Sequence, residues 1–549
     1  MKSYVSLDEI VEDLNKNMAS EKIIISCRDE ILKKGEISKS DIEAFKKAKE
    51  EFLNGKSMLL KIFNDKAKFA LDWSFLGDVY SDNFLDIKNE NDSLNIKEID
   101  MRYNYYLQVL SLLVTKGNNI SLVSNSALEG QIGILNLWIE KNILSLEDIN
   151  KIYVINDLKN IHWSKSGNVV QAIAYSLNNN IDLSMTKLSD FLDGKITLIS
   201  PDELRKILSN YKYFTPFYTK YHDVLKKNSI NIYVNSKLIK FSPRNFLYNI
   251  KESGIFNESL IPLGNVFKKD EKKSFDKLIR KIGVEYWLKL DGTSGSTVLK
   301  LNVKDDVEKI IKDFEKINII NKSYNNLVRP NCIIDNSFEL EIAQDIGTKF
   351  NSENMNHFNI QVGVINTNDV SKKFLPVIIN ISDKKDIGNG FAWGNMEKNL
   401  KGRIIEKLEQ PLLSLCKSLF DKLKEDFIIS LEGFAGYLKE SNEFDVCLLE
   451  ANLRISGSCL ITLTVHQLFT EIFKLPTETP FVTFNFAIKF KLIELYERIA
   501  NKYRLGFLVL GYEKDNIYKI LIYDKYNLNS KFYENIKLYV EYLKCNLES

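Results

Sequence analysis

The stretch VEYWLKLDGTSGSTVLKLN, from Val284 to Asn302, has the pattern of two strands joined by a turn of small residues. The turn DGTSGS contains two glycines and three hydroxyl residues. Glycine allows close approach of the backbone, and amide groups in such a turn can point at phosphate oxygens. Lys289, at the end of the first strand, can extend its ammonium group towards the same oxygens. The order of residues is not that of a Walker A loop. The stretch predicts either a phosphate-binding hairpin or an ordinary β-hairpin.

A second informative stretch is DVCLLEANLRISGS, from Asp445 to Ser458. Its apolar and then alternating pattern predicts a strand that continues through Arg454, with Glu450, Asn452 and Arg454 on one face. Mg²⁺ prefers hard oxygen ligands, and a guanidinium group can clamp phosphate oxygens. The alternative is a solvent-exposed face of an edge strand. The ISGS turn that follows favours a binding role.

Together the two stretches resemble the ATP-grasp superfamily, and EANLRISGS is most similar to its amino-acid and peptide ligases. The resemblance implies an α/β and α+β protein in which ATP lies between two α+β subdomains. It further implies an ATP-dependent carboxylate–amine ligase that forms an amide through an acyl-phosphate and requires Mg²⁺. A small-molecule carboxylate and an amine would be its substrates. A homodimer is possible, because relatives are often dimers.

The resemblance also assigns roles to individual residues. Lys289 matches the lysine that contacts the ATP phosphates, Glu450 and Asn452 match Mg²⁺ ligands, and Arg454 matches the arginine that binds phosphate or the acyl-phosphate. The flexible phosphate loop corresponds to Gly292, Thr293, Ser294, Gly295 and Ser296. Further nucleotide contacts are expected from Arg244 and, at an interdomain hinge in FELEIAQDIG, from Glu341, Gln344 and Ile346.

One position departs from the family pattern. The family usually has a second metal-binding acid shortly before the glutamate of E-x-N, and Tyr437 stands near that position here. Glu432, slightly upstream, is the alternative ligand. Without a carboxylate from one of these positions, the second Mg²⁺ would lack its ligand and the protein would not be expected to be catalytic. Two further functions therefore stay open: a non-catalytic ATP-binding protein with a regulatory or scaffold role, and an ATP-grasp kinase.

The flanking sequence predicts four regions. Residues 1–114 are expected to be helical, with Ser40 capping SKSDIEAFKKAKEEFLNG and Gly55 ending it. Residues 115–234 alternate between strand and helix patterns and predict a Rossmann-like pre-ATP-grasp unit, with parallel strands in NNISLVSN, KIYVIND and KITLISP. Residues 235–475 form the ATP-grasp region, in which DIGNGFAWGN is either a substrate loop or a β-connection. Residues 476–549 predict a C-terminal α+β appendage of two strands and a helix.

The composition bounds the class of protein. The 549 residues include 75 Lys and Arg against 73 Asp and Glu, a net charge of +2, which argues against a general nucleic-acid binder. The six cysteines form no CxxC pair, and this sparse usage is typical of a reducing compartment. The N-terminus lacks the pattern of a signal peptide, and no apolar run reaches the ~20 residues that span a bilayer. We expect a cytoplasmic protein that does not bind membranes.

Overall fold

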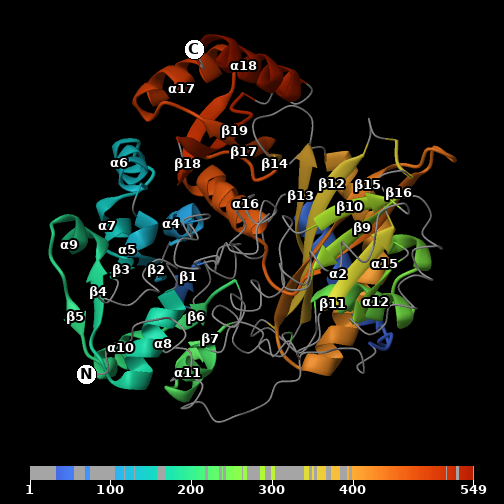
Figure 1. The fold of residues 1–549 in the computed structure, drawn as a ribbon, viewed down its shortest axis with the longest axis horizontal. Coiled ribbons are helices and arrows are strands. Elements are labelled where there is room, and N and C mark those ends of the chain that lie inside the picture. The colour runs from blue at the N-terminus through green and yellow to red at the C-terminus, as the bar shows by residue number, and fades with distance from the viewer. Residues whose placement is uncertain are drawn as a thin grey trace, which may run out of the picture.

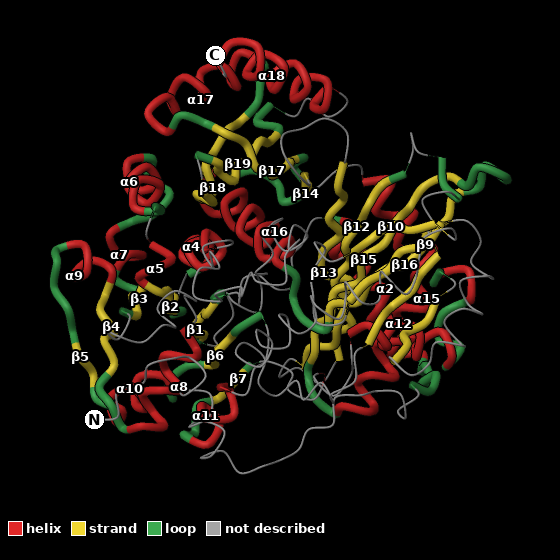
Figure 2. The backbone as a smooth tube through the Cα atoms, in the orientation of Figure 1, coloured by secondary structure: helices red, strands yellow, loops and turns green. Residues whose placement is uncertain are grey.

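The described residues of the computed structural model form three β-sheets with helices packed against them (Figure 1 and Figure 2). The residues that the structure describes are 32–54, 68–74, 105–115, 118–128, 130–156, 169–216, 221–233, 238, 243–262, 264–268, 285–290, 298–302, 339–344, 349–351, 355–366, 372–383, 392–394, 398–514, 516–526 and 531–547.

The first sheet has seven strands in the order β5-β4-β3-β2-β1-β6-β7. Its strands are β1 (Phe69–Asp72), β2 (Ile120–Ser124), β3 (Ile152–Ile155), β4 (Leu183–Lys187), β5 (Leu198–Ile199), β6 (Lys212–Phe214) and β7 (Asn231–Ile232). Its helices are α4 (Tyr105–Val114), α5 (Asn125–Leu128), α6 (Ile132–Glu140), α7 (Leu146–Ile149), α8 (Val169–Asn179), α9 (Leu188–Leu192), α10 (Pro201–Leu208) and α11 (Tyr221–Lys227).

The predicted α/β pattern is confirmed for most of this sheet, and two expectations are wrong. Strands β1, β2, β3, β6 and β7 are parallel, and β1 lies between β2 and β6. Strand β1 comes from the region expected to be helical, because its four buried residues are too few to show a period in the sequence. KITLISP contributes β5, which is antiparallel to β4 and forms the edge of the sheet instead of a parallel strand within it.

The second sheet contains the predicted hairpin. Strands β9 (Glu285–Leu290) and β10 (Val298–Asn302) pair antiparallel, as expected. The sheet order is β10-β9-β11-β8, completed by β11 (Glu339–Gln344) and β8 (Gly264–Lys268). Helix α12 (Pro243–Glu252) contacts both β8 and a strand of the third sheet, and therefore links the two sheets.

The third sheet has eight antiparallel strands in the order β16-β15-β12-β13-β14-β17-β19-β18. These are β12 (Asn356–Asn366), β13 (Lys372–Asp383), β14 (Ala392–Gly394), β15 (Phe427–Tyr437), β16 (Phe444–Asn452), β17 (Phe481–Ala487), β18 (Gly506–Lys514) and β19 (Ile517–Tyr523). Helix α15 (Lys398–Leu423) covers β12, β13 and β16, and its apolar side packs on Phe358, Ile360 and Leu431.

Helix α2 (Lys39–Leu53) packs on β13 and α15. Its N-cap is Ser38, whose Oγ accepts from the amide of Asp41 at 3.1 Å while the Asp41 carboxylate accepts from the Ser38 amide at 3.0 Å. The expected cap at Ser40 is therefore wrong, because an Asp three residues on completes the capping box from Ser38. Asn54 ends the helix, one residue before the expected Gly55.

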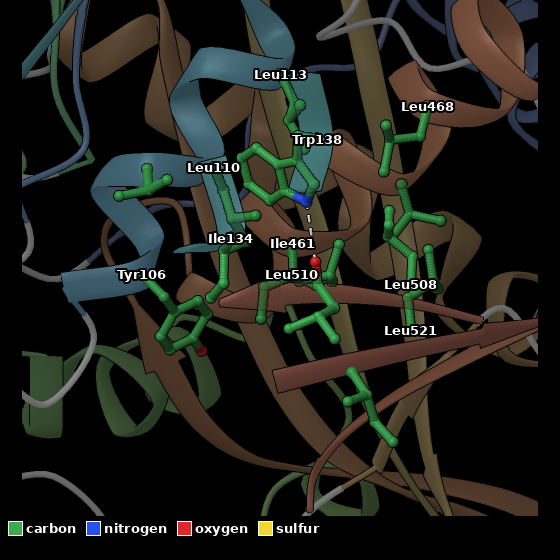
Figure 3. Packing of buried hydrophobic residues seen from close by; sticks show 14 of the residues in the cluster. Tyr106, Leu110, Leu113, Ile134, Trp138, Ile461, Leu468, Leu508, Leu510 and Leu521 are labelled. Carbon is green, nitrogen blue, oxygen red and sulfur yellow. Dashed lines mark hydrogen bonds between the residues drawn. The ribbon is translucent and has the colours of Figure 1, made fainter. Parts of the chain in front are cut away.

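The C-terminal strands and helix are confirmed, and they are continuous with the rest of the fold. Strands β17 to β19 extend the third sheet, and α17 (Ile493–Lys502) and α18 (Phe532–Leu547) cover them (Figure 1). Residues of β18 and β19 share one apolar core with α4, α6 and α16 (Gly457–Gln467) (Figure 3). Within that core the indole N–H of Trp138 donates to the carbonyl of Val509 at 3.0 Å. Among the helices of the described residues, none combines the length and apolar character of a membrane span.

Candidate functional site

The face of the third sheet opposite α15 carries a row of polar residues. On β12, β15 and β16 the apolar side chains that pack on the helices alternate with side chains that point the other way. The latter are polar around Glu432, and Phe434 and Cys447 form a small apolar cluster beside them. Glu432 of β15 is paired directly with Glu450 of β16, and Ser430 is paired with Asn452. Residues opposite each other in a ladder lie on the same face, so the predicted ligands Glu432, Glu450 and Asn452 are brought together.

A β-bulge at Leu449 makes this arrangement possible. The pairing shifts there, with Glu432 opposite Glu450 but Gly433 opposite Leu448. Without the extra residue, Glu450 would share the helix-covered face with Leu448, because side chains alternate with a period of two. The strands approach closely at this point: a Cβ on Gly433 would lie 2.2 Å from the carbonyl oxygen of Cys447, so only glycine fits.

A partly buried hydrogen-bond network holds the Glu432 carboxylate. Its Oε1 accepts from the Asn359 amide at 2.8 Å and from the Asn452 amide at 3.1 Å. Asn359 Oδ1 in turn accepts from the Ser430 hydroxyl at 2.6 Å. His357 Nε2 lies 3.8 Å from the other carboxylate oxygen, Oε2. Asn359 and Ser430 were not predicted from the sequence, although the alternation of polar and apolar residues in HFNIQV was a signal for Asn359.

The chain leaves β16 at Asn452 and enters α16 beside this network. Ser456 is the N-cap residue of α16, and its Oγ accepts from the Asn359 amide at 3.2 Å. Gln361 Nε2 donates to the same oxygen at 3.5 Å, while Gln361 Oε1 is buried without a partner. The positive end of the α16 dipole therefore lies next to the polar face and favours an anion there.

Arg454 lies in the bend between β16 and α16. The expectation that it continues the strand is wrong, since the strand ends at Asn452, where the chain turns into the helix. Arg454 lies in the chain between Glu450 and the N-terminus of α16, and it is therefore still next to the polar face.

Tyr437 does not belong to the polar face. It pairs with Phe444 on the side of the sheet that packs on helices, and its hydroxyl accepts from Arg403 at 2.7 Å. The Arg403 guanidinium also lies 3.9 Å from the Phe444 ring centroid. Tyr437 is therefore part of a structural cluster, and the acid opposite Glu450 is Glu432.

The predicted nucleotide-contacting residues are placed by their backbone only or lie outside the described residues. Lys289 in β9 is paired with Glu341 in β11. Glu341 and Gln344 are within β11 and paired with β9, and Gln344 is the last residue of the strand. Their expected contact with the nucleotide stays a prediction. Arg244 is in the first turn of α12, the helix that contacts β16. Outside the described residues lie Gly292, Thr293, Ser294, Gly295, Ser296 and Ile346, and most of the Asp386–Asn395 segment, of which Ala392–Gly394 forms β14.

The oxygen atoms on the polar face suit a Mg²⁺ ion that also binds the phosphate groups of a substrate. Among the described residues, no group of three or more His, Cys, Asp and Glu side chains is arranged to hold a metal ion. Glu432, Glu450 and the amide of Asn452 offer hard oxygen atoms from one face. Mg²⁺ is commonly bound by one or two carboxylates together with substrate phosphates, so these residues fit the ion without an all-protein cage.

A second polar cluster lies at the carboxyl end of β1. Asp72 is fully buried and accepts from the hydroxyls of Ser74 and Tyr213, each at 2.5 Å. Burial raises the pKa of Asp72 to about 6, against the lowering effect of these hydrogen bonds. The Ser74 hydroxyl also accepts from the amide of Val169, so the cluster ties β1 to β6 and to the start of α8.

Neither models of protein families nor curated proteins match the sequence. The chain is similar to several solved structures. One is N5-carboxyaminoimidazole synthase from Aspergillus clavatus in complex with ADP and 5-aminoimidazole ribonucleotide, with 12% identity and a TM-score of 0.40 over 63% of this chain and 85% of that chain. The Staphylococcus aureus synthetase complexed with ADP has 13% identity and a TM-score of 0.36, over 61% and 94%.

D-alanine–D-alanine ligase from Helicobacter pylori has 13% identity and a TM-score of 0.32, over 64% of this chain and 97% of that chain. At these identities and TM-scores the similarities do not by themselves assign a fold or a function to this chain.

Proposed function

We propose that this protein is an ATP-dependent carboxylate–amine ligase. The observation that carries the proposal is the direct pairing of Glu432 with Glu450, with Asn452 beside them, on the polar face of a large antiparallel sheet. The sequence offers Tyr437 or Glu432 at the second metal-binding position, and the pairing of Glu432 with Glu450 supports Glu432. The hairpin with Lys289 belongs to a separate smaller sheet, which supports a nucleotide site between two subdomains.

The proposed roles of the site residues follow from their charges. Glu432, Glu450 and Asn452 would hold Mg²⁺, which would neutralise charge on the phosphates when bound. Arg454 and the N-terminus of α16 lie beside the same face and favour the anionic oxygens of the transferred phosphoryl group. The Asn359 amide fixes the Glu432 carboxylate, so that it is oriented before ligands arrive. Lys289 would contact the phosphates from the other sheet.

The reaction has two steps. A substrate carboxylate oxygen attacks the γ-phosphorus of ATP, the bond to the β-phosphate oxygen breaks, and ADP leaves. An amine nitrogen then attacks the acyl carbon of the acyl-phosphate, inorganic phosphate departs, and the amine loses a proton to solvent. Such phosphoryl transfer depends on positioning and charge stabilisation and needs no covalent nucleophile from the protein.

The proposed ligase activity is tested by tracing the γ-phosphate of ATP. Protein, Mg²⁺ and ATP labelled at the γ-position are incubated with pairs of amino acids and other small acids and amines. ADP, free phosphate and amide products are measured by chromatography and mass spectrometry. Free phosphate together with an amide confirms the ligase, whereas label retained on the acceptor identifies a kinase. ATP binding without ADP formation across the panel identifies a binding protein. Lys289→Ala and Glu450→Gln should abolish turnover, and Glu440→Gln, in an exposed turn, should not.

A further inference from the structure

The third sheet is continuous, but its two ends pack on separate apolar cores. Strands β12, β15 and β16 share a core with α2, α12 and α15, whereas β17, β18 and β19 share one with α4, α16, α17 and α18. Figure 1 shows α12 and α15 at the right of the molecule and α17 and α18 at its top. Among the described apolar residues of β12, β15 and β16, one, the partly buried Ile428, packs against the other core. Parts of a chain with cores of their own are expected to move relative to each other unless a large apolar interface joins them.

The two ends of the sheet are joined by a strand of three residues. Strand β14 pairs with β13 at three positions and with β17 at two, Thr483 and Val482. All seven residues of β17, by contrast, pair with β19. The chain crosses between the two ends again at residues 453–456, in the bend between β16 and α16. Short connections of this kind are where hinges absorb changes in φ and ψ.

The first sheet is fastened to the C-terminal strands. The side-chain amide of Gln131 donates to the Tyr512 carbonyl at 2.6 Å and accepts from the Tyr512 N–H at 2.9 Å, as a neighbouring strand would. Helix α4 lies directly on β18, since a Cβ on Gly511 would be 2.2 Å from the Cβ of Tyr106. With the shared apolar core, these contacts make the first sheet, α16 and β17 to β19 one body.

Polar contacts connect this body to the other end of the sheet beside the candidate site. Ser456 Oγ, at the start of α16, accepts from Asn359 at 3.2 Å and from Gln361 at 3.5 Å, both on β12. Ser456 makes no side-chain cap bond to its own helix, so its hydroxyl is directed at β12 instead. The Tyr233 hydroxyl, after β7, donates to the Asp426 carboxylate, just before β15. Helix α16 also contacts β13. Interfaces between parts that move are more polar than permanent ones.

We infer that the protein is hinged at β14 and at residues 453–456, and that closure of this hinge brings the positive end of α16 to the Glu432–Glu450 pair. The carboxylate pair is on one body and the helix N-terminus is on the other, so the site is complete only in the closed form. Ser456 and Tyr233 are positioning residues that hold the closed form. The consequence for phosphate binding rests on the proposed function, whereas the hinge itself does not.

Double electron–electron resonance on the full chain measures the distance between the two bodies. Spin labels at Glu440→Cys and Glu541→Cys, both at exposed positions, report on the hinge. The control pair, Leu146→Cys with Glu541→Cys, lies within one body, and Leu146 is 76% exposed. Cys416, Cys447 and Cys459 are buried, and the background replaces the remaining cysteines with Cys27→Ser, Cys332→Ser and Cys545→Ser.

Without ligands, the 440–541 pair should show two distance populations and the 146–541 pair one. Ser456→Ala and Tyr233→Phe each remove hydrogen bonds of the closed form and should raise the ratio of open to closed molecules by at least about fivefold. The two effects should multiply in the double variant, because they act on one hinge through separate contacts. The control Ser209→Ala removes a hydrogen bond within the first body and should leave the ratio unchanged.

Mg²⁺ with ATP should shift wild type towards the closed population. One 440–541 distance in wild type and in both variants, or equal changes in the 146–541 pair, would overturn the hinge. A ratio that stays the same while calorimetry shows ATP bound would overturn the role of closure in phosphate binding. If wild type does not bind ATP, the proposed ligase fails, and the response of the distances to Ser456→Ala and Tyr233→Phe still decides the hinge.

Discussion

The substitution Asn359→Asp tests the network around Glu432 most sharply. Asp has nearly the shape of Asn, and it can still accept a hydrogen bond from the Ser430 hydroxyl. The amide nitrogen that donates to Glu432 Oε1 at 2.8 Å is replaced by a carboxylate oxygen, which cannot donate. Asn359 is 1% exposed, so solvent cannot screen the new charge. Two like charges that relax to about 4 Å repel by about 4 kcal/mol at an effective dielectric constant of about 20. The lost hydrogen bond to a charged group adds about 1.5 kcal/mol.

Protonation of one carboxylate limits the cost, so we expect a loss of about 3–5 kcal/mol in the free energy of unfolding at pH 7. For a large domain this lowers the midpoint of thermal unfolding by about 6–20 °C. The difference from wild type should shrink towards pH 5, because the crowded carboxyl group binds a proton more strongly in the folded than in the unfolded protein. Mg²⁺ without ATP should also raise the midpoint more in the variant than in wild type, because it meets an additional carboxylate.

The assay is thermal unfolding followed by circular dichroism at several pH values, with and without Mg²⁺. Asn442→Asp, in an exposed turn, is the control and should change stability by less than about 0.5 kcal/mol. A variant as stable as wild type at pH 7, or one whose loss is the same at every pH, would refute the assigned contact. Destabilisation that Mg²⁺ does not relieve would argue against a cation site at Glu432.

Three further outcomes are expected. Gly433→Ala should lower stability by about 3 kcal/mol or more and abolish Mg²⁺-dependent ATP binding, because its Cβ would lie 2.2 Å from the Cys447 carbonyl oxygen at the bulge; thermal unfolding and calorimetry measure both effects. Trp138→Phe should cost about 1–3 kcal/mol in denaturant unfolding, since the buried Val509 carbonyl loses its donor at 3.0 Å. Burial lowers the pKa of His466 from 6.5 to about 3, so the unfolded chain binds the proton first as the pH falls. Stability should therefore decrease from about pH 6.5 towards pH 3, by up to about 5 kcal/mol, and His466→Phe should flatten this dependence.

Local patterns were enough to predict several elements of the site. The pairing of β9 with β10 follows from the strand patterns on either side of a turn-like composition, and the common face of Glu450 and Asn452 follows from the strand period. Both features depend on residues that are close in sequence. The C-terminal strands and final helix follow in the same way from alternation and helical spacing.

The features that the sequence analysis missed depend on contacts between distant segments. The bulge at Leu449 has no marker in LLEAN, and only the pairing with β15 shows which carboxylate stands opposite Glu450. Counting residues along the chain pointed to Tyr437, which faces the other side of the sheet. Asn359 comes from β12, whose place beside β15 is set by long-range strand pairing. Arg454 leaves the strand because α16 begins three residues later, at Gly457.

Calorimetric titration of ATP, with and without Mg²⁺, tests the central claim that the Glu432–Glu450 pair forms a Mg²⁺-nucleotide site. Wild type and Glu440→Gln should bind ATP in a Mg²⁺-dependent manner, and Glu450→Gln should lose that dependence. Absence of ATP binding in wild type, or binding that is indifferent to Mg²⁺ and to the Glu450 substitution, would contradict the account.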